Sequence, residues 1–189
     1  MKYGQIGRWS AFILALALGA SLLVGRFMPK QVVVSRSITI AATPQAIYPL
    51  LADFRNGWTR WDASDDEDPG IAYAYSGAVT GVGAMQTWIS KKRGNGQMTL
   101  VSADTLKGVA FDQVVGDGKD PFRMQGTLSM EPEGQGTRVT WTDHAETGSD
   151  PGKRLMAPLL TKMIAQSMEK SLAGIKTLAE SAPLPVATP

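Results

Sequence analysis

The segment from Lys153 to Ser181 predicts one long amphipathic helix near the end of the chain. At about 100° per residue, its large apolar side chains gather on one side, and Lys162, Gln166 and Glu180 lie opposite them. A helix of this kind needs an apolar surface to cover, so it constrains the fold of everything that precedes it. The apolar stripe consists of Leu160, Ile164, Met168, Leu172, Ile175 and Leu178.

The region before this helix predicts six short strands separated by turns that contain glycine or proline. Short connections between consecutive strands indicate an antiparallel meander. Alternation places Phe111 and Trp141 on the face that meets the helix, whereas the irregular pattern around Trp88 leaves the side of that residue open. The predicted strands are Ile71–Ser76, Ala84–Lys91, Gly96–Ala103, Gly108–Val115, Phe122–Met130 and Thr137–Ala145.

An alternating segment, Val32–Ile40, predicts one further strand ahead of the meander. Arg36 falls on its apolar side, either as an ion-paired arginine of an edge strand or as a cation aimed at an acidic ligand group. Thr43 and Pro44 then supply the cap and first residue of a short helix. The predicted fold class is α+β: a curved antiparallel sheet of six to seven strands wrapped on a long C-terminal helix, preceded by an N-terminal transmembrane helix.

The N-terminal region contains 17 uncharged residues, 9–25, between Arg8 and Arg26. This run predicts a transmembrane or signal-anchor helix, with a cleaved signal peptide and a buried core helix as alternatives. The basic flanks favour a single-pass membrane protein with a cytoplasmic N-terminus and the domain outside the membrane. The predicted divisions are a basic flank (1–8), the membrane helix (9–27), a linker (28–31), one domain (32–181) and a disordered proline-rich tail (182–189).

Charge and cysteine content exclude several classes of function. Residues 1–30 hold four of the 19 basic residues and none of the 17 acidic ones, so the remainder has 15 basic and 17 acidic residues. We expect no nucleic-acid partner, because such proteins normally present a dense basic surface to phosphates. The chain has no cysteine, which excludes disulfides, thiol nucleophiles and thiolate metal sites.

The predicted order of elements and several short motifs together resemble the START-like, or polyketide cyclase and lipid-transfer (SRPBCC), superfamily. This resemblance covers residues 32–180 and implies a helix-grip fold with an apolar cavity between sheet and helix. Membership implies binding of a hydrophobic small molecule but does not imply catalysis. The motifs are residues 34–51, Trp58 and Trp61, Tyr75-Ser76-Gly77 before Gly81-Val82-Gly83, residues 136–141, and residues 170–176.

The only histidine, His144, stands beside Asp143 near the end of the last predicted strand. A single imidazole without cysteine or clustered carboxylates does not make a zinc site, so we expect no metal and no cofactor. If Trp141 faces the core, alternation turns Asp143 inward and His144 outward. Asp143 would then be a polar anchor or a general base, whereas the simpler interpretation is a solvated acid at a strand end.

The leading hypothesis is a membrane-anchored domain that binds a lipid, sterol or polyketide-like molecule between sheet and helix, without covalent chemistry. Methionines suit such a pocket because thioethers adapt to ligands of imprecise shape. The alternatives are a polyketide cyclase/dehydratase-like enzyme that uses the same cavity, with Asp143, Arg36, Tyr73 or Tyr75 as polar groups, and an interaction module with a filled core. The predicted ligand-binding residues are Tyr73, Met98, Phe111, Met124, Trp141, Asp143 and Met163.

Overall fold

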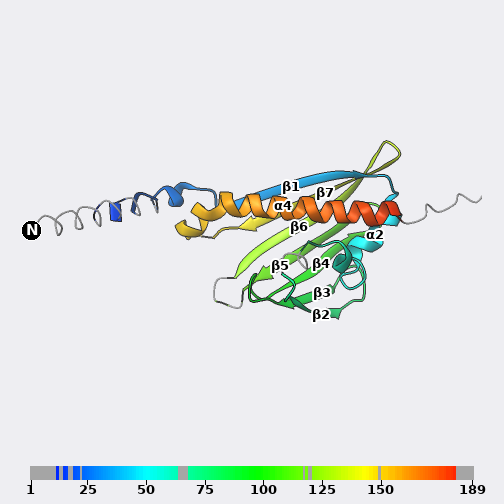
Figure 1. Cartoon of the computed structure of the whole chain (residues 1–189), viewed down its shortest axis with the longest axis horizontal. Helices are drawn as coiled ribbons and strands as arrows, with labels where there is room; N and C mark the ends of the chain where they lie inside the picture. Colours follow the sequence, from blue (N-terminus) through cyan, green and yellow to red (C-terminus); the bar gives the residue numbers. More distant parts are fainter. Residues whose placement is uncertain are drawn as a thin grey trace, which may run out of the picture.

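The computed structural model describes residues 12, 15–16, 19–21, 23–63, 68–116, 118, 121–148 and 150–181. In this part of the chain, a seven-stranded antiparallel sheet curls around the 31-residue helix α4 (Pro151–Ser181), as Figure 1 shows. The predicted helix-grip α+β fold is therefore confirmed. The predicted tail, residues 182–189, lies outside the described residues.

The strands follow the chain in one meander, except for the first. Sheet order is β1-β7-β6-β5-β4-β3-β2, so the first and last strands are neighbours. Between β1 at one edge and β2 at the other, the described residues form a short helix and a 3-10 turn. The elements are β1 (Gln31–Ile40), α2 (Pro44–Ala52), η1 (Trp58–Arg60), β2 (Ala72–Gly77), β3 (Ala84–Ile89), β4 (Gly96–Asp104), β5 (Gly108–Val115), β6 (Phe122–Glu133) and β7 (Gly136–Glu146).

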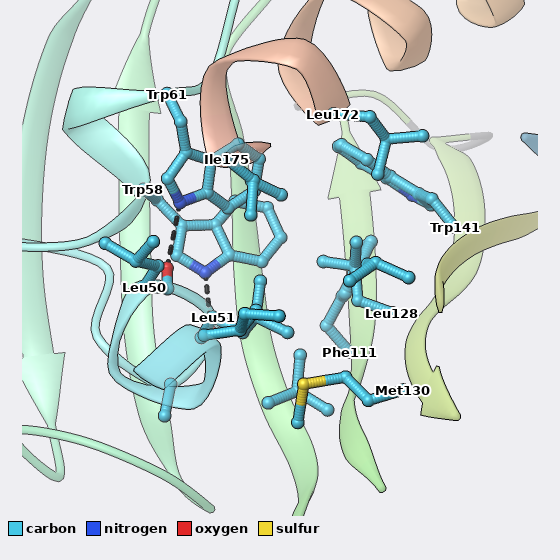
Figure 2. Close-up of a cluster of buried hydrophobic side chains, with 14 of the residues drawn as sticks. Leu50, Leu51, Trp58, Trp61, Phe111, Leu128, Met130, Trp141, Leu172 and Ile175 are labelled. Atoms are coloured by element: carbon cyan, nitrogen blue, oxygen red, sulfur yellow. Dashed lines mark hydrogen bonds between the residues drawn. The ribbon is translucent and has the colours of Figure 1, made fainter. Parts of the chain in front are cut away.

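Two tryptophans fix the corner between α2 and η1. The indole N–H of Trp58 donates to the carbonyl of Leu51 at 2.7 Å, and that of Trp61 donates to the carbonyl of Leu50 at 2.8 Å. Both bonds are drawn in Figure 2. These carbonyls lie in the last turn of α2, where intrahelical donors run out, so the indoles complete the helix end.

The same tryptophans join the corner to the inner face of the sheet. The Trp58 ring packs edge-on against Phe111 of β5 at 5.4 Å and against Trp141 of β7 at 6.0 Å between centroids. Leu172 and Ile175 of α4 belong to the same buried cluster and are labelled in Figure 2. The core is thus shared by the sheet, α2, η1 and α4.

Helix α4 buries a face slightly rotated from the predicted stripe. Met168, Leu172 and Ile175 are buried as expected, but Leu160 is 39% exposed. Met163 is 59% exposed because it stands five residues before Met168, which is about 140° around a helix. Pro158 lies within the helix, which begins at Pro151 rather than after this second proline.

Arg36 takes the first of its two predicted roles. Its Nε donates to Glu169 of α4 at 2.5 Å, and both side chains are partly exposed. Strand β1 is an edge strand of the sheet. The ion pair joins this edge to the helix, and Arg36 does not border the cavity described below.

The prediction of a single-pass membrane protein is wrong. A crossing requires an apolar helix of about 20 residues. Within the described ranges, no helix combines that length with sufficient apolar character. Of the predicted membrane helix, residues 9–11, 13–14, 17–18 and 22 lie outside the described residues.

A glycine on β6 gives the inner face of the sheet room for two larger side chains. Gly126 pairs with Phe111 on one side and with Asp143 on the other. A Cβ at this position would overlap both the Phe111 ring and the Asp143 carboxylate. We therefore expect Gly126→Ala to lower the free energy of unfolding by about 1–3 kcal/mol, as overpacking of a core does. Urea denaturation measures this change.

Gly118→Ala is the matched control, because a Cβ there meets no atom within 4 Å and the backbone is not left-handed. Its effect should stay within about 0.5 kcal/mol. Equal effects of the two substitutions would contradict the packing argument.

Candidate functional site

A cavity of about 110 Å³ lies between the inner face of the sheet and α4. The sheet supplies most of its wall, α4 supplies three side chains, and η1 with the loops before β2 and after β3 supplies the rest. The lining residues are Trp58, Asp62, Ile71, Tyr73, Gln86, Trp88, Arg93, Met98, Gln113, Met124, Trp141, Asp143, Ile164, Ser167 and Met168.

Three buried tryptophans and Tyr73 supply the aromatic side chains of the wall, and each of the three indole N–H groups is already bonded inside the protein. Trp58 donates to Leu51, Trp88 donates to the Gly94 carbonyl at 3.0 Å, and Trp141 donates to Asp143 Oδ1 at 2.8 Å. The tryptophans therefore present carbon surface to the cavity.

Methionine and glutamine alternate along one cross-strand row of the wall. Met124 pairs with Gln113, Gln113 pairs with Met98, and Met98 pairs with Gln86. All four side chains share one face of the sheet, because directly paired residues point to the same side. This row places two amides among flexible apolar side chains.

Asp143 is the most deeply buried acid of the cavity wall, with 2% of its surface exposed. Burial raises the pKa of this carboxyl from the ordinary 3.8 to about 7, and the hydrogen bond from Trp141 opposes the rise. The interpretation of Asp143 as a solvated strand-end acid is wrong, because period-two alternation places it on the Trp141 face. Near neutral pH the side chain can therefore both accept and donate a hydrogen bond.

The structure brings five of the seven predicted ligand-binding residues together. Phe111 is fully buried behind the wall, where it supports Trp58 and Trp141. Met163 lies on the exposed side of α4. The five that border the cavity are Tyr73, Met98, Met124, Trp141 and Asp143.

The prediction from sequence missed the contribution of β3. Gln86 and Trp88 both face the cavity and are buried. The two residues are two positions apart, so they lie on the same face of the strand. Because one of them is polar, however, the strand does not show the regular apolar–polar alternation by which an inner face is recognised. Gln113 was missed for the same reason, although it shares a face with Phe111.

His144 lies on the outer face of β7 and is exposed, as alternation predicts. In the part of the chain that the structure describes, no group of three or more histidines and acids is arranged to hold a metal ion. The cavity wall combines apolar surface with the polar side chains of Asp62, Tyr73, Gln86, Arg93, Gln113, Asp143 and Ser167.

Comparisons with known proteins agree with this geometry. The family model described as polyketide cyclase / dehydrase and lipid transport matches residues 31–180. None of the curated proteins is similar enough in sequence to this chain to count as a relative.

Several solved structures share the fold at low sequence identity. Protein CV1439 from Chromobacterium violaceum is 14% identical, with 82% of this chain and 100% of that chain covered and a TM-score of 0.57. TTHA0849 from Thermus thermophilus is 18% identical, with coverages of 78% and 97% and a TM-score of 0.54. The di-domain ARO/CYC StfQ from the steffimycin biosynthetic pathway is 13% identical, with coverages of 79% and 51% and a TM-score of 0.58.

The burial of Asp143 predicts a specific pH dependence of stability. Between pH 4 and pH 7 this carboxyl is ionised in the unfolded chain but protonated in the folded one, so the folded state binds more protons and stability falls as pH rises. Asp143→Asn removes the titrating carboxyl, and with it this contribution to the pH dependence of stability, but it keeps an oxygen that accepts the hydrogen bond from Trp141. We expect the stability of the native chain, relative to the variant, to fall by on the order of 4 kcal/mol across this window.

Urea denaturation of both proteins at several pH values between 4 and 8 measures the difference. The difference should level off about one pH unit above the folded-state pKa, near pH 8. Curves that run parallel from pH 4 to pH 8 would show that Asp143 does not titrate in this way.

Proposed function

Because the chain belongs to the polyketide cyclase/dehydrase and lipid transport family, we propose that it binds a small hydrophobic molecule between the sheet and α4 without covalent chemistry. The observation that carries this proposal is the cavity of about 110 Å³ beneath α4, with its wall of tryptophan and methionine. An aromatic and apolar lining with a few placed polar groups is the usual composition of a small-molecule site.

The volume of the cavity favours the small end of the ligands that the resemblance implies. Sites for drug-sized ligands enclose roughly 300–1,000 Å³, whereas an apolar cavity of about 150 Å³ accommodates benzene. A ligand of one ring fits the present space of about 110 Å³ with small adjustments of Met98, Met124 and Met168. A sterol or a long acyl chain would require α4 to move away from the sheet.

The burial of only one titratable side chain in the described part of the wall argues against the cyclase-like alternative. Acid–base catalysis needs at least one titratable group within reach of the substrate, and usually a second one to return the proton. Among the described residues of the wall, Asp143 is the single titratable side chain that is fully buried. Arg36 and Tyr75, two other polar candidates, do not border the cavity. The likeness to StfQ concerns the fold alone.

The test begins with the purified full chain. Organic extraction and mass spectrometry should find a bound small molecule, and added toluene should shift the indole N–H signals of Trp88 and Trp141 in an NMR titration. A chain with no extractable molecule and no response to toluene at either indole would contradict the proposed function.

A cavity-filling substitution makes the test specific to this site. Ser167 borders the cavity from α4, so Ser167→Phe should place a ring in the space and weaken toluene binding at least tenfold, or about 1.4 kcal/mol. Met163→Phe adds a ring to the exposed side of the same helix and should leave toluene affinity unchanged. Equal losses in both variants would indicate a general effect on α4 rather than occupation of the cavity.

A further inference from the structure

Gln86 is a buried polar side chain with no hydrogen-bond partner among the residues that the structure describes. Only 4% of its surface is exposed, and it borders the cavity. None of the hydrogen bonds among the described residues involves its amide. Buried polar groups in folded proteins are nearly always hydrogen-bonded, so an unbonded amide aimed at a cavity indicates a partner that occupies the cavity.

The neighbouring row strengthens this interpretation. Gln113 also borders the cavity, and its amide makes no hydrogen bond within the described part of the chain. Gln86 and Gln113 flank Met98 on strands β3 and β5, so their backbones are about 10 Å apart at the usual strand spacing. Side chains of this length can reach the same small group between them.

We propose that the natural ligand is a ring-sized molecule that carries a hydroxyl group, and that Gln86 determines this specificity by hydrogen-bonding that hydroxyl, with Gln113 as the second amide. This inference rests on the proposed function, because it concerns the ligand of the same cavity. The inference adds to the proposed function that the ligand must carry a polar group, which an apolar wall alone would not require.

A hydroxyl fits the chemistry of the site better than a charged group does. An amide side chain offers both a donor and an acceptor, and a hydroxyl likewise does both. Among the described residues of the wall, no positively charged side chain is buried, since Arg93 is exposed, so a carboxylate or phosphate would enter without a buried counter-charge. The tryptophan walls accept the planar carbon skeleton.

The experiment compares two probes that differ by one hydroxyl, p-cresol and toluene. NMR titrations of the full chain, followed at the indole signals of Trp88 and Trp141, give both dissociation constants. We expect p-cresol to bind at least tenfold more tightly than toluene. In Gln86→Met the ratio of the two dissociation constants should shrink to less than about threefold, since the hydroxyl then lacks its main partner.

A thermal measurement separates a binding role from a structural one. Replacing an unbonded buried amide by an apolar side chain of similar volume should raise the Tm of Gln86→Met by roughly 2–4 °C. A glutamine retained for the fold would give a lower Tm on the same substitution. Gln97→Met, on the outer face of β4, is the control and should leave both dissociation constants unchanged.

The outcomes distinguish this inference from the proposed function. Binding of both probes with equal affinity, unaltered by Gln86→Met, would overturn the assignment of Gln86 and leave the proposed function standing; the amide would then be paired with cavity water only. Binding of neither probe would overturn both. If Gln86→Met does not fold, Gln113→Met at the half-buried position carries the same test, and an undiminished preference for p-cresol there would overturn the inference.

Discussion

The hydrogen bond from the Trp58 indole to the Leu51 carbonyl is the interaction on which the arrangement of this domain most depends. It ties the end of α2 to η1, and it orients a ring that also contacts Phe54, Phe111 and Trp141. A helix end, a loop and two distant strands are therefore held by one side chain. Because the same ring borders the cavity, this part of the cavity wall belongs to the core itself.

This shared wall explains why the cavity is small. Rings packed at core density leave few voids, and those that exist are set by the shapes of rigid neighbours. Gly126 has no side chain, and this leaves room on the inner face of the sheet for Phe111 and Asp143 of the adjacent strands. The methionines of the wall are its adaptable part, so we expect a ligand to be accommodated by movement of these side chains.

The architecture could be predicted from the sequence because it depends on periodicity and turn residues, which are local properties. The pattern predicts strand β5 at its observed limits, Gly108 and Val115, and α4 ends at Ser181 as its apolar stripe indicates.

Cavity-facing polar residues could not be predicted in this way. Alternation identifies an inner face by its apolar members, so Gln86 weakens the very pattern that would reveal it. The neighbours of Gln86 are decided by the pairing of β3 with β4. Strand pairing depends on residues that are distant in the sequence, so local patterns do not predict it.

The two buried polar groups of the cavity have different physical situations. Asp143 has an internal donor in Trp141 and a pKa near neutrality, so the empty protein can accommodate it as a neutral acid. Gln86 has no such alternative, because an amide cannot lose its polarity by titration. The proposed ligand hydroxyl would compensate for its burial. Buried polar groups without a hydrogen-bond partner are expected at positions where a protein gives up stability for binding. The amide on β3, rather than the acid on β7, therefore points most directly to the chemistry of the ligand.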